Sequence, residues 1–130
     1  MSLSYAVFPL ARPTFDVPFA TEMKDHAFAA LDRAGIKTIG PRDLLFDADA
    51  VQQAMESIKG HKIDLVLIMQ ITFTDATMTR TLADSIKAPM AIWAVPEPRL
   101  GGRLRLNALC GLNLAAHALK KSGHDLGWLY

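Results

Sequence analysis

The stretch IDLVLIM, residues 63–69, restricts the fold of this chain more than any other feature of the sequence. It is an almost continuous apolar run, too short for an ordinary helix and without the alternation of a strand that has one face in water. Such runs are typical of the middle of a parallel sheet, where helices cover both faces. The sequence therefore predicts a central parallel strand between two layers of helices.

Further strands and helices are expected to alternate along the rest of the chain. Short apolar runs predict strands at residues 5–10, 36–39, 88–95 and 126–130. Helical spacing of apolar residues predicts a helix that ends at Gly35, one between Asp47 and Gly60, one capped by Thr74 or Asp75, and one over about residues 103–121.

This alternation, with short connections, favours right-handed crossovers and a parallel sheet. The fold class predicted is α/β, a doubly wound, flavodoxin-like sheet with strand order 2-1-3-4-5 in three layers. A chain of 130 residues, 51% of them hydrophobic, is long enough for one domain with a core and too short for two ordinary ones. We therefore expect a single domain over residues 1–130.

Ligands of doubly wound sheets bind where loops leave the carboxyl ends of the strands. Three such loops carry most of the polar side chains: ARPTFDVP at 11–18, QITFTD at 70–75 and PEPRLGGRLRLN at 96–107. Arginines and carboxylates beside aromatic rings suit a polyhydroxylated ligand, because hydroxyls need donors and acceptors while sugar C–H faces stack on rings. The candidates are Arg12, Thr14, Asp16, Gln70, Thr72, Thr74, Asp75, Glu97, Arg99, Arg103, Arg105 and Asn107, with the rings of Phe15, Phe73 and Trp93.

Several of these residues also have a purely structural interpretation. For Asp75, a role as helix cap is twice as probable as a contact with the ligand. Asp16 could equally well stabilise its own turn. Arg103 and Arg105, two apart on the predicted helix, would face different partners, so at least one of them is expected to be structural. Arginines at a helix N-terminus would also suit an anion such as phosphate. The arginine that contacts the ligand stays open between Arg99, Arg103 and Arg105.

Composition excludes several classes of function. The formal net charge of +1 provides no field that would attract nucleic acid or an anionic membrane. The single cysteine excludes an internal disulfide framework, and with no secretory or spanning segment in the sequence a cytoplasmic protein is expected. The four histidines are dispersed without metal-ligand spacing, and Cys110 is expected to be a buried, inert thiol. We identify no catalytic residue and no metal ligand in the chain.

The fourth predicted helix, residues 103–121, is apolar on almost every side. Such a helix is normally buried all round, so one face should cover the sheet and the other a second domain or subunit. Gly111 costs helix stability and therefore indicates close packing by a neighbour. A further helix would normally follow the fifth strand, so the chain is expected to be part of a longer protein.

Four segments of the loops and the last helix resemble a known family. ARPTFD (11–16), TFTDA (72–76), WAVPE (93–97) and GGRLRLNALCGLNLAAHAL (101–119) are similar to the N-terminal domain of the L-fucose isomerase and L-arabinose isomerase family, especially its fucose isomerase-like members. The resemblance covers almost the whole chain, and its last motif is long and specific.

This resemblance implies an aldose–ketose isomerase that uses a divalent metal, usually manganese, bound by two carboxylates and a histidine in later domains. The N-terminal domain is then a module of a hexameric or related homo-oligomer, and its strand-end loops reach the active site of an adjacent subunit. Sugar binding, stacking and site closure would fall to Arg12, Asp16, Phe73, Asp75, Glu97, Arg103 and Asn107, with Arg99 as a further candidate. The isolated chain is expected to be inactive.

Two other hypotheses remain open. The chain could be a free-standing flavodoxin-like module that binds a sugar or sugar phosphate without catalysis. It could also be a pure oligomerisation domain whose polar loops only form interface salt bridges. In each case the expected partners exclude nucleic acid and membranes.

Overall fold

The computed structural model describes residues 2–130 and confirms the predicted α/β fold. A five-stranded, all-parallel sheet has the order β2-β1-β3-β4-β5. The elements are β1 (Ser4–Leu10), α1 (Val17–Arg33), β2 (Lys37–Ile39), α2 (Ala48–Ser57), β3 (Leu65–Gln70), α3 (Thr77–Ser85), β4 (Met90–Ala94), α4 (Ala108–Lys121) and β5 (Leu126–Leu129).

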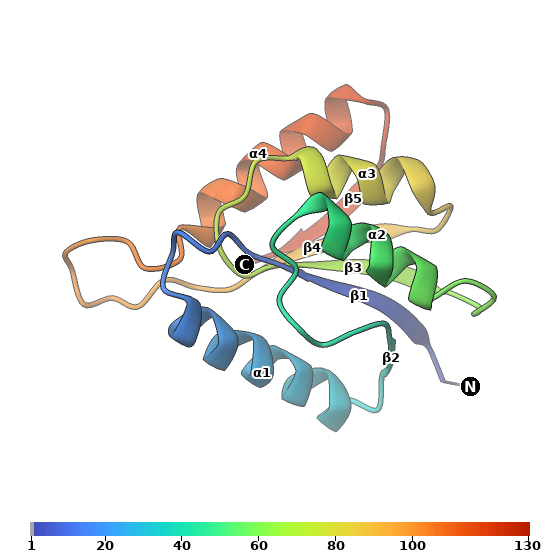
Figure 1. The fold of residues 1–130 in the computed structure, drawn as a ribbon, viewed down its shortest axis with the longest axis horizontal. Helices are drawn as coiled ribbons and strands as arrows, with labels where there is room; N and C mark the ends of the chain where they lie inside the picture. Colours follow the sequence, from blue (N-terminus) through green and yellow to red (C-terminus); the bar gives the residue numbers. More distant parts are fainter. Residues whose placement is uncertain (1) are drawn as a thin grey trace.

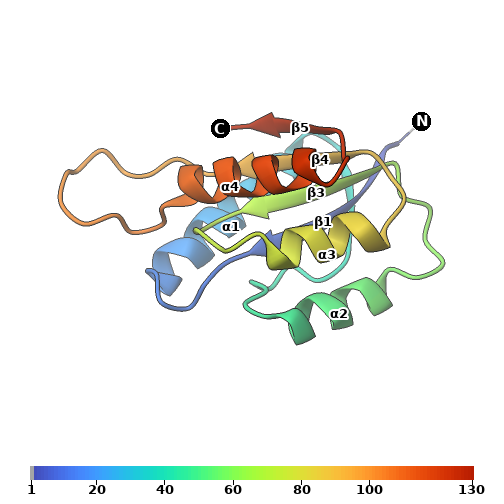
Figure 2. The same cartoon turned by 90° about the horizontal axis from the view of Figure 1, so that it is seen from above.

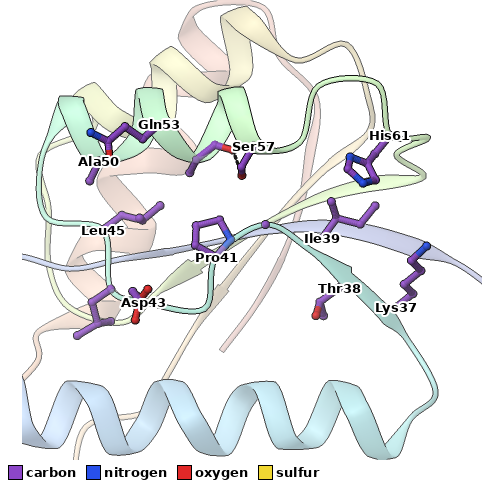
Figure 3. A pocket seen from close by; sticks show the side chains of 13 residues that line it. Lys37, Thr38, Ile39, Pro41, Asp43, Leu45, Ala50, Gln53, Ser57 and His61 are labelled. Carbon is purple, nitrogen blue, oxygen red and sulfur yellow. Dashed lines mark hydrogen bonds between the residues drawn. The ribbon is translucent and has the colours of Figure 1, made fainter.

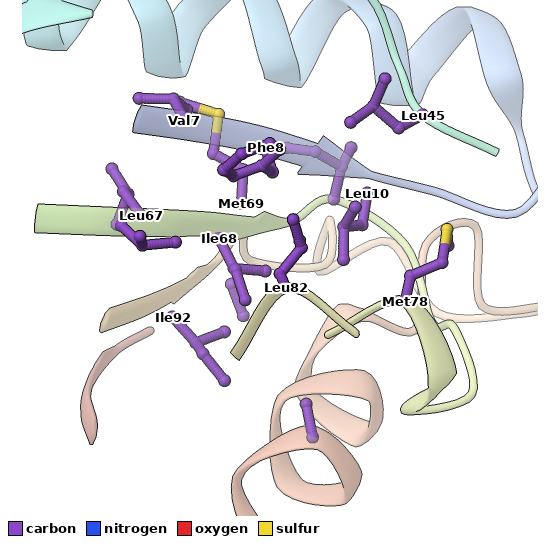
Figure 4. Close-up of a cluster of buried hydrophobic side chains, with 14 of the residues drawn as sticks. Val7, Phe8, Leu10, Leu45, Leu67, Ile68, Met69, Met78, Leu82 and Ile92 are labelled. Atoms are coloured by element: carbon purple, nitrogen blue, oxygen red, sulfur yellow. The ribbon is translucent and has the colours of Figure 1, made fainter. Parts of the chain in front are cut away.

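The helices form two layers on the sheet. Helix α1 lies on one face, and α2, α3 and α4 lie on the other (Figures 1 and 2). Buried aliphatic and aromatic side chains fill the space between the layers, among them Phe8, Leu10, Ile68, Leu82 and Ile92 (Figure 4). This is the three-layer arrangement that the alternating sequence pattern predicts.

Strand β3 occupies the centre of the sheet, as the run at 63–69 predicts. Its neighbours are β1 and β4, and its residues from Val66 to Gln70 are buried. Gln70 pairs in register with both Leu10 of β1 and Ala94 of β4. The carboxyl ends of the three strands are therefore level, and the loops that follow them begin side by side.

Two of the four helices, α1 and α2, begin directly after capping aspartates. The carboxylates of Asp16 and Asp47 accept hydrogen bonds from Phe19 N (3.1 Å) and Ala50 N (2.8 Å), so each caps the helix that follows it. Helix α3 begins only at Thr77, whose N–H donates to Asp75 Oδ1 at 3.0 Å. Asp75 thus has the cap-like role that its sequence position indicates, although Ala76 is the formal cap residue.

Helix α4 starts later than the sequence predicts. We expected it from about residue 103, but it begins at Ala108, and residues 103–107 belong to the loop. Asn107 has φ 54°, in the left-handed region, so the helical conformation cannot continue toward residue 103. Arg103 and Arg105 are therefore loop residues, and the prediction that they lie on different sides of a helix is wrong.

Within residues 2–130, only one face of α4 is buried. Leu112, Ala115 and Leu119 pack into the core, whereas Leu109 and Leu114 are 42% and 39% exposed. Cys110 is also exposed, so the prediction of a buried thiol is wrong. The expectation that a neighbour covers the second face stays a prediction.

Gly111 allows α4 to approach the sheet closely. A Cβ atom built at this position would lie 2.9 Å from Gln70 Nε2 and 3.0 Å from Gln70 Cγ. Gln70 is fully buried, and its amide nitrogen donates to Thr72 O (2.8 Å) and Thr74 Oγ1 (2.9 Å), so it cannot move freely. The predicted close neighbour of Gly111 is thus the chain's own central strand.

The sheet face that holds α1 also carries an apolar groove over β4 and β5. The groove has a volume of about 500 Å³, and Tyr5, Leu67, Trp93 and Leu129 contribute to its lining. Trp93 is half-buried there and Leu129 is exposed. No helix within residues 2–130 is both long and apolar enough to cross a lipid bilayer.

We predict that Gly111→Ala lowers the free energy of unfolding, because its new methyl group would clash with the buried Gln70 side chain. Overpacking costs about 1–3 kcal/mol, more than the ~0.5–1 kcal/mol gained in helix propensity. Urea denaturation of the purified chain measures the difference. Asn113→Ala, on the exposed face of α4, is the control and should be neutral or slightly stabilising; equal stabilisation by both variants would contradict the close approach.

Candidate functional site

The loops that follow β1, β3 and β4 are joined to one another by backbone hydrogen bonds. Asp16 N donates to Arg105 O at 3.2 Å, and Phe73 N donates to Leu106 O at 2.8 Å. Arg12 N donates to the hydroxyl of Thr72 at 2.8 Å. The fold therefore brings the three predicted loops together at one edge of the sheet.

Glu97 holds the third loop closed. Its carboxylate accepts hydrogen bonds from the backbone N–H groups of Arg105, Leu106 and Asn107, with N···O distances of 2.9–3.1 Å. The intervening residues 98–104 consequently leave the sheet and return to the start of α4, as the orange loop in Figure 1 shows. Glu97 is a structural anchor in this chain, a role that sequence reasoning missed.

Asp16 and Arg105 form an ion pair between the first and third loops. Arg105 Nε lies 2.8 Å from Asp16 Oδ2, and the guanidinium carbon of Arg105 is 3.9 Å from the centre of the Phe19 ring. The hydrogen bond from Phe19 N and the Arg105 guanidinium lower the pKa of Asp16 below its ordinary value of 3.8. Asp16 therefore both caps α1 and fixes Arg105.

Arg12 and Asp75 form a second pair, between the first and second loops. Arg12 Nη2 lies 3.3 Å from Asp75 Oδ2, and the Arg12 guanidinium carbon is 5.3 Å from the centre of the Phe73 ring. The ring of Phe73 is in turn 6.5 Å from that of Phe15. Hydrogen bonds from Thr77, with a smaller contribution from Arg12, lower the pKa of Asp75.

The remaining predicted site residues are less constrained. Arg99 and Arg103 are exposed, and neither forms an ion pair or side-chain hydrogen bond within residues 2–130. Asn107 is half-buried at the start of α4, and its side chain makes no capping hydrogen bond. All eight predicted residues lie on the three joined loops or next to them; their role in substrate binding stays a prediction.

Two grooves open among these loops. One, of about 440 Å³, is lined by Thr14, Phe15, Asp16, Arg103, Leu104 and Arg105. The other, of about 210 Å³, lies between the first loop, the second loop and the start of α2, and has Arg12, Asp47 and Asp75 in its wall. The first groove offers a hydroxyl, a carboxylate, guanidinium groups and an aromatic ring, which are the groups that bind sugars.

Trp93 does not belong to this group of aromatic rings. It lies within β4 and lines the apolar groove beside α1, whereas Phe15 and Phe73 lie in the loops. Phe19 replaces it as the third ring near the site, since Arg105 packs over it. Its position three residues after the cap Asp16 is the sequence signal that could have identified it, because the first helical turn remains next to the strand end.

A larger hollow, of about 700 Å³, lies between β2, the loop that follows it and α2. Figure 3 shows Lys37, Thr38 and Pro41 on one side of it, and Gln53, Ser57 and His61 toward the helix. It shares no lining residue with the two grooves at the strand ends. This hollow is therefore separate from the predicted sugar site, although it is larger.

The described residues do not fit a metal site. Within residues 2–130, no group of three or more His, Cys, Asp or Glu side chains is placed to hold a metal ion. The carboxylates at the strand ends already have partners: Asp16 pairs with Arg105, Asp75 with Arg12, and Glu97 with backbone N–H groups. We therefore derive no chemical step from a metal bound by these residues.

Glu97→Gln should loosen the third loop, because an amide group cannot accept hydrogen bonds from three N–H groups as a carboxylate does. We expect the free energy of unfolding to fall by about 1–3 kcal/mol. Backbone amides of residues 105–107 should exchange faster with solvent in NMR spectra. Glu22→Gln, on the exposed side of α1, is the control, and equal effects of both substitutions would contradict the anchoring role of Glu97.

The lowered pKa of Asp16 predicts how the loop contact depends on pH. A group whose folded pKa is below its unfolded pKa adds stability above the unfolded value, here about 3.8, and loses it as pH falls through the folded value. The NMR titration of the Asp16 carboxyl carbon should therefore have a midpoint below 3.8. Asp16→Asn, which can still cap α1, should weaken the acid-induced loss of stability; a midpoint at or above 3.8 would contradict the pairing with Arg105.

The comparisons with known proteins agree on one family. The model of the family described as "Fucose/sulfoquinovose isomerase, N-terminal domain" matches residues 6–129. A sulfoquinovose isomerase of Priestia aryabhattai is 33% identical over 122 residues, which are 94% of this chain and 27% of that protein. A sulfoquinovose isomerase of Alkalicoccus urumqiensis is 27% identical, over 98% of this chain and 28% of that protein. A sulfoquinovose isomerase of Clostridium sp. is 28% identical, over 92% of this chain and 26% of that protein.

The chain spans about a quarter of the length of these curated relatives. No solved structure matches it significantly. The family match covers all four helices and all five strands except the first two residues of β1. The chain therefore belongs to the family of fucose/sulfoquinovose isomerase N-terminal domains.

Proposed function

We propose that the chain is the substrate-contacting and assembly domain of a metal-dependent aldose–ketose isomerase whose substrate is a sulfonated hexose. The observation that carries this proposal is the union of three strand-end loops into one surface with a sugar-sized groove. The family supports the reaction class, and the relatives named sulfoquinovose isomerase support the sulfonated sugar.

The joined loops would bind the sugar rather than transform it. Phe15 offers a ring face to sugar C–H groups in the groove, with the ring of Phe73 6.5 Å from it, and Thr14 and Asp16 offer a donor and an acceptor to hydroxyls. The paired arginines hold the carboxylates in fixed positions, so the groove is formed before the ligand arrives. Such preorganisation reduces the entropy lost on binding.

The metal and the acid–base groups would come from residues outside 2–130. The relatives are about four times as long as this chain, which leaves room for a catalytic domain. A divalent ion such as Mn²⁺, when bound there, would polarise the oxygens of the open-chain sugar. The role of this chain's own residues is to orient the sugar and to exclude water from one side of it.

Assembly into a homo-oligomer would use the uncovered face of α4. Leu109 and Leu114 are exposed on that face, and Leu104 and Leu100 are exposed on the adjoining loop. Apolar side chains gathered in this way are typical of protein–protein interfaces. The same contact would place the strand-end loops close to a neighbouring subunit.

A free-standing sugar-binding module is the second candidate. It is favoured by the groove at 14–16 and 103–105, which this chain forms by itself. The two functions differ in what the chain needs: the binder acts alone, whereas the isomerase domain requires the rest of a longer protein. Tight binding of sulfoquinovose by the 130-residue chain would favour the second candidate.

We expect a full-length protein that carries this domain to convert sulfoquinovose to its 2-keto isomer with Mn²⁺ and to lose this activity in EDTA. Phe15→Leu, which removes the ring face in the groove but keeps apolar volume, should raise the KM about tenfold, and Phe15→Tyr should leave it unchanged. Product formation is followed by NMR.

A full-length protein that stays inactive with Mn²⁺, Co²⁺ or Mg²⁺ would overturn the proposed isomerase activity. Ketose formation by the isolated 130-residue chain would contradict the proposal that the catalytic groups lie outside it. An unchanged KM with weakened assembly would assign the loops to an interface.

A further inference from the structure

The arginines at the strand ends fall into two classes. Arg12 and Arg105 have their charges offset by Asp75 and Asp16, at 3.3 and 2.8 Å, and both pack over phenylalanine rings. One guanidinium donor of each arginine, Arg12 Nη2 and Arg105 Nε, is thus already used in an ion pair. An arginine whose charge is offset by a nearby carboxylate attracts an anion less than an unpaired arginine does.

Arg99 and Arg103 form the second class. Within the part of the chain that the structure describes, neither has a carboxylate partner. Of these two arginines, only Arg103 lines the groove of about 440 Å³, together with Thr14 and Phe15. Because Asp16 and Arg105 cancel each other, the guanidinium of Arg103 gives this groove its excess positive charge.

Two features of the backbone flank Arg103 in the third loop. Gly101 and Gly102 have φ angles of 72° and 78°, in the left-handed region, and the chain bends at residues 102–103. Two residues later, Arg105 N is held by Glu97. The backbone at Arg103 therefore lies between a bend on one side and an anchored residue on the other.

From this arrangement we propose that Arg103 binds the sulfonate of the sugar and determines specificity for a sulfonated over a neutral hexose. The inference rests on the function proposed above and assigns one group of the substrate to one residue. A sulfonate is anionic at every physiological pH and has three acceptor oxygens. A planar guanidinium can donate two parallel hydrogen bonds to such a group.

The sugar ring would then occupy the rest of the groove. With the sulfonate at Arg103, the hydroxyls can reach Thr14 and the Asp16–Arg105 pair, and a ring face can reach Phe15. A neutral hexose would make these contacts without the charge pair. Arg103 should therefore affect the binding of the sulfonated sugar alone.

The test compares sulfoquinovose with 6-deoxyglucose, the same sugar without the sulfonate, in the full-length protein. Arg103→Gln should weaken sulfoquinovose binding, measured by calorimetry without metal and by KM with metal, about 10- to 100-fold. Binding of 6-deoxyglucose should change less than about twofold, and kcat should stay near that of the wild type. Arg103→Lys should restore part of the affinity.

Arg33→Gln is the matched control, since Arg33 is an exposed arginine at the opposite end of the domain, in the last turn of α1, and has no acidic partner within residues 2–130. Equal effects of Arg103→Gln on both sugars, or none on either, would overturn the inference while leaving an active isomerase in place. Tighter binding of glucose 6-phosphate than of sulfoquinovose would overturn the assignment to a sulfonate. A wild-type protein that binds sulfoquinovose but isomerises neither sugar would instead refute the proposed function.

Discussion

The carboxylate of Glu97 is the contact on which the arrangement of the strand-end loops depends. By accepting N–H groups from residues 105–107, it fixes the segment that leads into α4. The carbonyl groups of Arg105 and Leu106 in that segment then accept Asp16 N from the first loop and Phe73 N from the second. One side chain thus organises three loops that lie far apart in the sequence.

Charge pairing gives the surface its chemical character. The first loop contributes one member of each of two ion pairs, Asp16 with Arg105 of the third loop and Arg12 with Asp75 of the second. Exposed pairs of this kind add little stability, but they hold donors and acceptors in set positions. The surface consequently has both polar groups and aromatic faces in place, with one guanidinium in the groove left without a carboxylate partner.

The fold could be predicted from the sequence because hydrophobic periodicity determines it. The run at 63–69 has only one good position, the middle of a parallel sheet, and the flanking strands and capped helices follow from local signals such as Asp16 and Asp47. The same reasoning placed the candidate side chains at one edge of the sheet. These features depend on local pattern and on topology, both of which can be read from a sequence.

Features that depend on contacts between distant residues could not be predicted. Helical spacing continues through Arg103 and Arg105, but Asn107 has a left-handed backbone and Glu97 holds residues 105–107 in a loop, so α4 begins at Ala108. The exposure of Cys110 reflects the single face that α4 presents to the sheet. Which arginines pair with a carboxylate likewise follows only from distances between atoms in the structure. Composition alone shows only that the numbers of basic and acidic residues nearly balance.

A crystal structure of the full-length protein with bound sulfoquinovose, prepared without metal so that no turnover occurs, tests the central claim most directly. We predict that the sugar contacts side chains from the loops after β1, β3 and β4 and that Glu97 keeps its backbone hydrogen bonds. A sugar that contacts only residues outside this domain, with the three loops packed against another subunit, would contradict the account.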